Sequence, residues 1–138
     1  MIVYLDASVV LRLILGEPHP LAEWRKIDQA VASALGEVEC LRTLDRLARS
    51  GPLSSDELAQ RRGAVYHFFE AVELVDVSRA ILRRASGSFP TPLGTLDAIH
   101  LSTALFWREA RDENLVMATH DRALATAAHA VGLQVTGV

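Results

Sequence analysis

The stretch "IVYLDASVVLRLIL", residues 2–15, shows the pattern from which the fold of this chain can be predicted. Residues 2–5 are a short apolar run of β-prone side chains, and Asp6 follows them directly. The run "SVVLRLIL" after it is typical of a helix capped by Ser8. The order is therefore strand, acid, helix.

The same alternation continues to the end of the chain. Further strands are expected at 30–35, at 72–77, at 115–119 and in "QVTGV" at 134–138. Helices are expected over 36–51, from about 55 to 69 after a Ser54/Glu57 capping box, over 78–86, from 93 onward after a loop at 87–94, and over 122–132. Short apolar strands between helices predict βαβ units, hence an α/β fold of three layers, α/β/α, with a central, mostly parallel sheet.

Composition limits the class of protein. A chain of 138 residues, 50% hydrophobic and 22% charged, has the size and composition of one globular domain, and no repeat or linker divides residues 1–138. Its net charge of −3 gives no general attraction for nucleic acid. The single cysteine, Cys40, excludes an intramolecular disulfide and multi-cysteine metal sites, and we expect it to be buried.

Nothing in the sequence indicates a membrane protein. The longest apolar runs are a few residues, against the roughly 20 that a membrane-spanning helix needs. The start "MIVYLDASVV" has neither the basic beginning nor the cleavage site of a secretory signal. We therefore expect a cytoplasmic protein with no membrane partner.

A second informative stretch is "LGTLDAIHLSTAL", residues 93–105, an apolar helix that carries Asp97. Its apolar side chains fall on two stripes, one with Leu93, Asp97, Leu101 and Ala104, the other with Ile99, Thr103 and Phe106. A carboxylate on a buried helix needs a charge partner, hydrogen-bond donors or a metal. The structural alternative is that Thr95 is the N-cap and Asp97 meets the positive end of the helix dipole.

Two more acids follow strands. Asp6 and Asp121 are predicted at the carboxyl ends of strands, where open parallel sheets bind ligands. Each could instead be an ordinary turn residue that accepts hydrogen bonds from backbone amides. Together with Asp97 they can converge, and unit charges about 4 Å apart repel by roughly 4 kcal/mol at an effective dielectric of 20. Such a cluster requires a cation or shared protons.

The helix expected over 36–51 offers a fourth acid, although periodicity does not choose between Glu37 and Glu39. Leu35, Val38, Leu41 and Leu44 are expected to form its apolar face.

Polar residues near these acids have two possible roles. Ser8 and Thr119 could hydrogen-bond a ligand or only the local backbone, and we expect Ser8 to be the helix cap. His100, one turn after Asp97, could hydrogen-bond near the site, but we expect a satisfied core or surface histidine.

Four motifs in this order resemble those of the PIN-domain ribonucleases, and among them the VapC-type toxins of bacterial toxin–antitoxin pairs. The motifs cover essentially the whole chain and read "YLDASVVLRLILGEP", "VECLRTL", "TLDAIHLSTAL" and "ATHDRALATAAHAVGLQV". The resemblance places the family's four catalytic acids at Asp6, Glu39, Asp97 and Asp121, and so selects Glu39 over Glu37. Two positions depart from it: Gly94, where many relatives have arginine, and His120, where an aromatic residue is common.

The resemblance implies an endoribonuclease that leaves a 5′-phosphate. Carboxylate oxygens suit Mg²⁺ or Mn²⁺, and we expect Asp6 and Asp97 to be the principal metal ligands, with Glu39 and Asp121 completing the site directly or through water. The implied partners are an RNA substrate, a cognate antitoxin and a second copy of the chain. Arginines that could bind RNA phosphates are Arg12, Arg42, Arg46 and Arg122.

Other functions are less well supported. The chain has no P-loop, no dinucleotide fingerprint, no G-x-S-x-G elbow and no zinc-ligand spacing. A receiver-type phosphoacceptor would need a lysine at a late strand end, and the only lysine is Lys26. The remaining alternative is a non-catalytic PIN-like interaction module whose acidic pocket binds an arginine of a partner. Trp24, residues 9–15 and residues 65–69 could supply apolar surface to a partner or a dimer, although we expect core packing for each.

Overall fold

All five strands form one sheet, and every neighbouring pair is parallel. The structure is a computed structural model that describes residues 1–138. The strands are β1 (Ile2–Leu5), β2 (Gln29–Ser33), β3 (Glu73–Val75), β4 (Val116–Ala118) and β5 (Gln134–Thr136). Their order in the sheet is β3-β2-β1-β4-β5.

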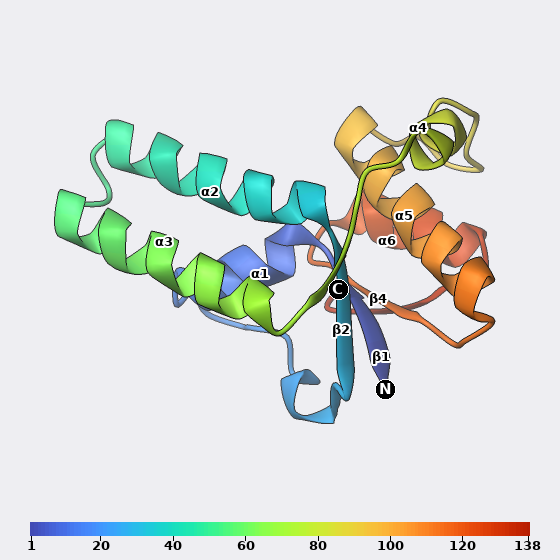
Figure 1. Cartoon of the computed structure of the whole chain (residues 1–138), viewed down its shortest axis with the longest axis horizontal. Helices are drawn as coiled ribbons and strands as arrows, with labels where there is room; N and C mark the ends of the chain where they lie inside the picture. The colour runs from blue at the N-terminus through green and yellow to red at the C-terminus, as the bar shows by residue number, and fades with distance from the viewer.

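Helices cover both faces of this sheet. They are α1 (Ala7–Ile14), α2 (Ala34–Arg49), α3 (Ser55–Glu70), α4 (Arg79–Ala85), α5 (Thr95–Arg111) and α6 (Arg122–Ala130), with one short 3-10 turn, η1 (Trp24–Lys26). Figure 1 shows α1, α2 and α3 on one side of the sheet and α5 and α6 on the other, with α4 beside α5. The predicted three-layer α/β/α fold is confirmed.

The central strand β1 shows why each face has its own core. Val3 and Leu5 point to the side of α1, α2 and α3, whereas Tyr4 points to the side of α5 and α6. All three are at most 1% exposed, as the two-residue period of a strand covered on both faces requires. Tyr4 therefore faces α5 and α6, as does the partly buried Ile2.

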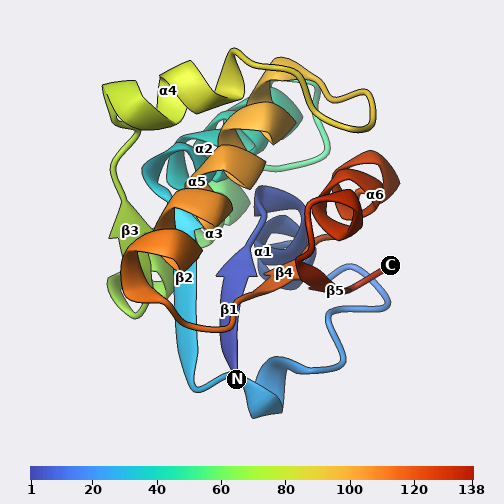
Figure 2. The same ribbon diagram turned by 90° about the vertical axis from the view of Figure 1, so that its right-hand side faces the viewer.

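The parallel arrangement brings four chain segments to one edge of the sheet. β1, β2 and β4 end there and lead into α1, α2 and α6, and α5 also begins there because it runs antiparallel to the strands (Figure 2). The residues at these junctions, Asp6, Ser33, Asp97 and Thr119, therefore lie at the carboxyl edge. None of the helices is both long and apolar enough to cross a bilayer.

Some local predictions hold and others need correction. The Ser54/Glu57 capping box is present at the start of α3, and Cys40 is fully buried. The second strand ends at Ser33, not residue 35, because the Ser33 side chain accepts a hydrogen bond from the Leu35 amide and so caps α2 two residues earlier than expected.

Two predicted helix caps are wrong. Ser8 does not cap α1, which begins at Ala7 after Asp6 in the N-cap position, and Thr95 is the first residue of α5, with Gly94 in the cap position. Two residues assigned to apolar faces are also exposed: Val38 by 54% and Phe106 by 40%. Val38 lies on the side of α2 opposite to its buried residues Gly36, Cys40 and Leu44, so the predicted apolar face of this helix is wrong at that position.

Candidate functional site

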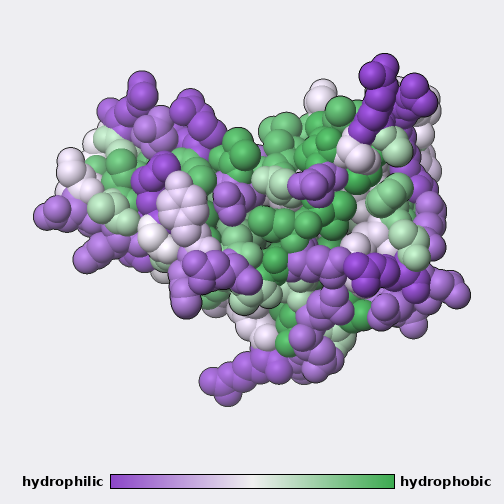
Figure 3. Space-filling view, viewed as in Figure 1, coloured by the Kyte–Doolittle hydropathy of each residue, from purple (hydrophilic) through white to green (hydrophobic).

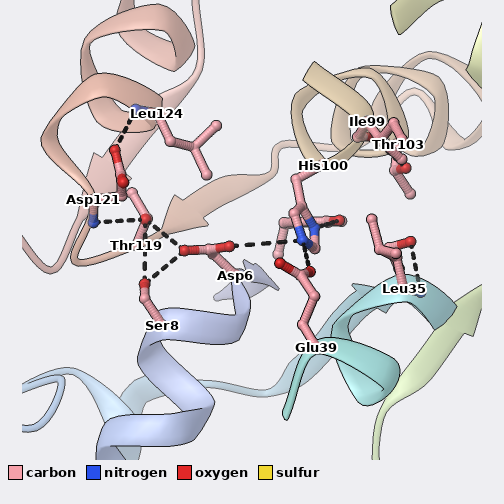
Figure 4. A network of polar contacts seen from close by, with 12 residues as sticks. Asp6, Ser8, Leu35, Glu39, Ile99, His100, Thr103, Thr119, Asp121 and Leu124 are labelled. Atoms are coloured by element: carbon pink, nitrogen blue, oxygen red, sulfur yellow. Dashed lines mark hydrogen bonds and ion pairs between the residues drawn. The ribbon is translucent and has the colours of Figure 1, made fainter. Parts of the chain in front are cut away.

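Asp6 is the most firmly held acid of the carboxyl edge. It follows β1 directly, is 5% exposed, and its backbone amide donates to the Ala118 carbonyl of β4 at 3.0 Å. Its Oδ2 accepts hydrogen bonds from Ser8 Oγ at 2.6 Å and Thr119 Oγ1 at 2.8 Å (Figure 4). The other oxygen, Oδ1, faces His100 Nε2 at 3.8 Å.

The two hydroxyls also tie β1 to the turn after β4. Ser8 Oγ accepts from the His120 amide at 3.0 Å, and Thr119 Oγ1 accepts from the Asp121 amide at 3.0 Å. The expected helix cap at Ser8 is therefore wrong: its hydroxyl contacts Asp6 and the backbone after β4. Thr119, fully buried, makes the same kinds of contact from the end of the neighbouring strand β4.

Asp121 lies in the N-cap position of α6, where its Oδ1 accepts a hydrogen bond from the Leu124 amide at 3.0 Å. The turn role proposed as its structural alternative is therefore real. A capping carboxylate has a second oxygen free to accept, so the role does not prevent participation in the site.

Glu39 reaches the edge from α2 and contacts His100. Its Oε1 is paired with His100 Nε2, and its side chain is 23% exposed. On the other side of the ring, His100 Nδ1 lies 2.8 Å from the hydroxyl of Tyr4, and both of these side chains are fully buried. Figure 4 shows His100 between Asp6 and Glu39.

The charges around His100 affect its ionisation. Burial lowers the pKa of His100, but the hydrogen bond to Glu39 and the charge of Asp6 outweigh burial and raise it above the usual value. Burial, with the charge of Asp6, raises the pKa of Tyr4 well above its usual value, so Tyr4 remains a neutral hydroxyl.

Asp97 has no hydrogen-bond partner or ion-pair partner, although it is partly buried in the first turn of α5. Burial, together with the charges of Asp121 and Asp6, raises the pKa of its carboxyl group to about 6. Burial is the largest cause, and the charges of Asp121 and Asp6 act in the same direction.

No arginine or lysine compensates these carboxylates. Of the arginines expected near the site, Arg12 donates to the His19 carbonyl, Arg42 pairs with Asp45, and Arg46 donates to Thr43. Neither Arg42 nor Arg46 pairs with Glu39, although all three are on α2. His100 is the one side chain in ion-pair distance of Asp6 and Glu39 that can carry positive charge.

The donor set fits a hard divalent cation, since it consists of carboxylate and hydroxyl oxygens around negative charge that no arginine or lysine compensates. The side chains are not closed around one point: no three Asp, Glu, His or Cys residues are arranged as a ready metal site. Asp6 and Glu39 flank His100, while the charges of Asp121 and Asp6 act on Asp97.

Sequence reasoning underestimated one residue and misassigned another. His100 is the buried, satisfied histidine that was expected, but its partner is Glu39 of the site itself. The available signal was its place one helical turn after Asp97 on an apolar helix. Ser8 was expected to be a cap, and its spacing two residues after Asp6 was the signal for its contact with that carboxylate.

Most of the apolar surface considered for a partner is core. Trp24 packs edge-on against Phe68, with ring centroids 5.9 Å apart, and Val65 and Phe69 are buried. Helix α1 contributes Val9, Val10 and Ile14 to the same core. Of these segments, Leu13 and Tyr66 remain more than one-third exposed.

Comparison with known proteins identifies the family. The PIN domain profile matches residues 3–130. Ribonuclease VapC45 of Mycobacterium tuberculosis (strain CDC 1551 / Oshkosh) is 33% identical over 138 residues, which cover 97% of this chain and 94% of that protein. Ribonuclease VapC46 of Mycobacterium tuberculosis (strain ATCC 25618 / H37Rv) is 36% identical over 107 residues, covering 74% and 73% of the two chains.

Solved structures show the same fold at low sequence identity. A toxin–antitoxin complex from Klebsiella pneumoniae superposes with a TM-score of 0.66 at 16% identity, covering 89% of this chain and 90% of that one. VapBC2 from Rickettsia felis, bound to a DNA fragment from its promoter, gives 0.65 at 15% identity, with 98% and 97% covered. The chain therefore belongs to the PIN-domain family, among its VapC-type ribonucleases.

Proposed function

We propose that this protein is a Mg²⁺- or Mn²⁺-dependent endoribonuclease that acts as the toxin of a toxin–antitoxin pair. The observation that carries the proposal is the set of carboxylates at the carboxyl edge of the sheet, in which Asp97 has a pKa raised to about 6 by burial, Asp121 and Asp6. The family and the names of the relatives support ribonuclease activity.

In this proposal Asp6 and Asp97 hold the metal, and Glu39 and Asp121 complete the site directly or through water. When bound, the ion supplies Lewis-acid activation of the attacking water and neutralises charge that develops on the phosphodiester. The chain itself orients the ligands: Ser8 and Thr119 fix Oδ2 of Asp6, which leaves Oδ1 on the side of His100.

RNA phosphates would be bound by arginines next to the acids. Arg42 and Arg46 follow Glu39 by three and seven residues and therefore share its face of α2. Arg46 has no acidic partner, whereas Arg42 pairs with Asp45. We expect Arg46→Glu to weaken RNA binding and to reduce its dependence on log salt concentration by about one counterion. Arg49→Glu, farther out on α2, is the matched control, and equal effects of the two would exclude a specific role for Arg46.

A cognate antitoxin and a second copy of the chain are the proposed protein partners. Solved structures of this fold include toxin–antitoxin complexes, one of them from Klebsiella pneumoniae, which supports an antitoxin. An antitoxin that covered the carboxyl edge would directly block the access of RNA to the site.

The test is an RNA cleavage assay with antitoxin-free protein. Total bacterial RNA is incubated with Mg²⁺, with Mn²⁺ or with EDTA, beside an Asp97→Asn variant shown by circular dichroism to be folded. We expect discrete fragments with either metal and none with EDTA or with the variant.

Cleavage by folded Asp97→Asn at the wild-type rate would contradict the assignment. No cleavage under any metal would favour the non-catalytic alternative, in which the acidic pocket binds an arginine of a partner protein.

A further inference from the structure

His100 stands out because it is a fully buried ionisable side chain inside a cluster of acids, and the proposed reaction has no step that uses it. Its ring nitrogens contact Glu39 on α2 and Tyr4 on β1, and Nε2 also lies 3.8 Å from Oδ1 of Asp6. Both ring nitrogens have protein partners, so the orientation of the ring is fixed from both sides.

The four acids differ in how they are held. Asp6 accepts from two hydroxyls, and Asp121 accepts from the backbone of its own helix. Asp97 belongs to the first turn of α5 and has a short side chain. Glu39 has the longest side chain of the four and one polar contact, Nε2 of His100.

The partners of the ring determine its proton arrangement. An ionised carboxylate only accepts hydrogen bonds, so Nε2 must carry a proton toward Glu39. The Tyr4 hydroxyl can donate to Nδ1 or accept from it, and it holds the other side of the ring in either case. Tyr4 is itself immobile, because it is fully buried in β1 and faces α5.

We propose that His100 is the positioning residue of the site: held by Tyr4, it fixes the Glu39 carboxylate beside Asp6. This inference rests on the proposed function for its consequence in catalysis, but its effect on metal binding can be measured separately. His100 acts through Glu39 and does not touch the substrate.

Two substitutions of His100 test the contacts of its two ring nitrogens separately. The amide of glutamine at position 100 can reach the place of Nε2 and donate to Glu39, whereas the shorter asparagine amide lies near the place of Nδ1 and faces Tyr4. We expect His100→Asn to weaken Mn²⁺ binding about 10- to 100-fold, as is typical when a residue that orients a metal ligand is removed. His100→Gln should retain most of the affinity.

The decisive experiment is a double-mutant cycle with His100→Asn and Glu39→Gln, with Mn²⁺ affinity measured by isothermal titration calorimetry. If His100 acts through Glu39, the asparagine substitution has no further effect in the Glu39→Gln background. His129→Asn, an exposed histidine on α6, is the matched control and should equal wild type. Additive effects, or equal losses for the asparagine and glutamine variants, would overturn the proposal.

Tyr4→Phe tests the other side of the ring and also serves if His100→Asn does not fold. It should lower Mn²⁺ affinity in the same direction as His100→Asn, by less, and only while Glu39 is present. Wild-type affinity of folded Tyr4→Phe would overturn the role of Tyr4.

RNA cleavage by the same variants is measured in parallel. If wild type does not cut RNA, the proposed function fails, while the affinity cycle still decides the role of His100.

Discussion

Carboxylates at the two ends of the sheet have different kinds of partner. At the amino end, Glu73 at the start of β3 accepts hydrogen bonds from Gln29 at 2.7 Å, Trp107 at 3.1 Å and Arg111 at 2.7 Å. At the carboxyl end, Asp6 and Asp97 have no arginine or lysine partner. Helix α5 connects the two, with Asp97 in its first turn and Arg111 as its last residue.

The difference separates Glu73, which has a structural role, from the acids that we propose to form the metal site. Glu73 joins two strands and a helix, and its charge is neutralised by Arg111 within the fold. At the carboxyl end His100 is the one side chain in ion-pair distance of Asp6 and Glu39 that can carry positive charge, and Asp97 has no ion-pair partner. The kind of partner therefore distinguishes the two sites: an arginine at the amino end and a histidine at the carboxyl end.

The largest expected effect is on activity. Asp6→Asn should reduce metal-dependent RNA cleavage on the order of 10³-fold, because it removes the charge of a proposed metal ligand, and metal-ion catalysis contributes several kcal/mol to the transition state. Glu73→Gln should leave cleavage per folded molecule within about twofold of wild type, since Glu73 lies at the other end of the sheet. Initial rates on one defined RNA measure both. Similar losses of cleavage rate for the two variants would contradict the assignment of catalysis to the carboxyl end alone.

The second expected effect is on stability, at the amino end of the sheet. Glu73→Ala leaves Trp107 Nε1 and Gln29 without their acceptor and should lower the free energy of unfolding by about 2 kcal/mol. Urea unfolding followed by circular dichroism measures it, with Glu109→Ala, in the exposed ion pair with Arg84, as a control that should lose at most about 1 kcal/mol. An unchanged midpoint for Glu73→Ala would remove its structural role.

The smallest expected effect concerns Asp97 in metal-free protein. Its pKa is raised to about 6 from 3.8, so ionisation of this carboxyl group is less favourable in the folded state than in the unfolded one. The free energy of unfolding therefore falls as pH rises from about 4 to about 6, where the proton is lost from the folded state, and this loss remains above pH 6. Asp97→Asn should stabilise the metal-free protein at pH 7.5 by about 1 kcal/mol, after allowance for partial exposure.

Thermal unfolding in EDTA at pH 7.5 and pH 4 measures this effect. At pH 4 the difference between Asp97→Asn and wild type should be small, because the aspartic acid is then mostly protonated in the folded state. A variant that is less stable than wild type at pH 7.5 would show that the Asp97 carboxylate is compensated after all.

Much of the fold could be predicted because its signals are local. The run 2–5 followed by Asp6 and the capping box at Ser54 each depend on a few neighbouring residues, and both were found where expected. Asp6 and Asp121 could be assigned to the sheet edge because strand ends in a parallel sheet meet there. The choice of Glu39 over Glu37 needed the family resemblance, since helical periodicity allows either.

Contacts between distant segments could not be predicted in the same way. His100 reaches Glu39 across 61 residues of sequence, and its ring is held by Tyr4 across 96. The cap assigned to Ser8 was wrong for a related reason: the hydroxyl has a better acceptor in Asp6 and a donor in the His120 amide, 112 residues away. Local propensity gives no information on such partners.

Calorimetric titration of Mn²⁺ into the metal-free protein tests the contrast between the two ends most directly. Wild type and Glu73→Gln should bind with the same affinity, and folded Asp6→Asn should show no saturable binding in the same concentration range. Equal binding by Asp6→Asn and wild type, or no binding by wild type, would contradict the assignment of a metal-dependent site to the carboxyl end of the sheet.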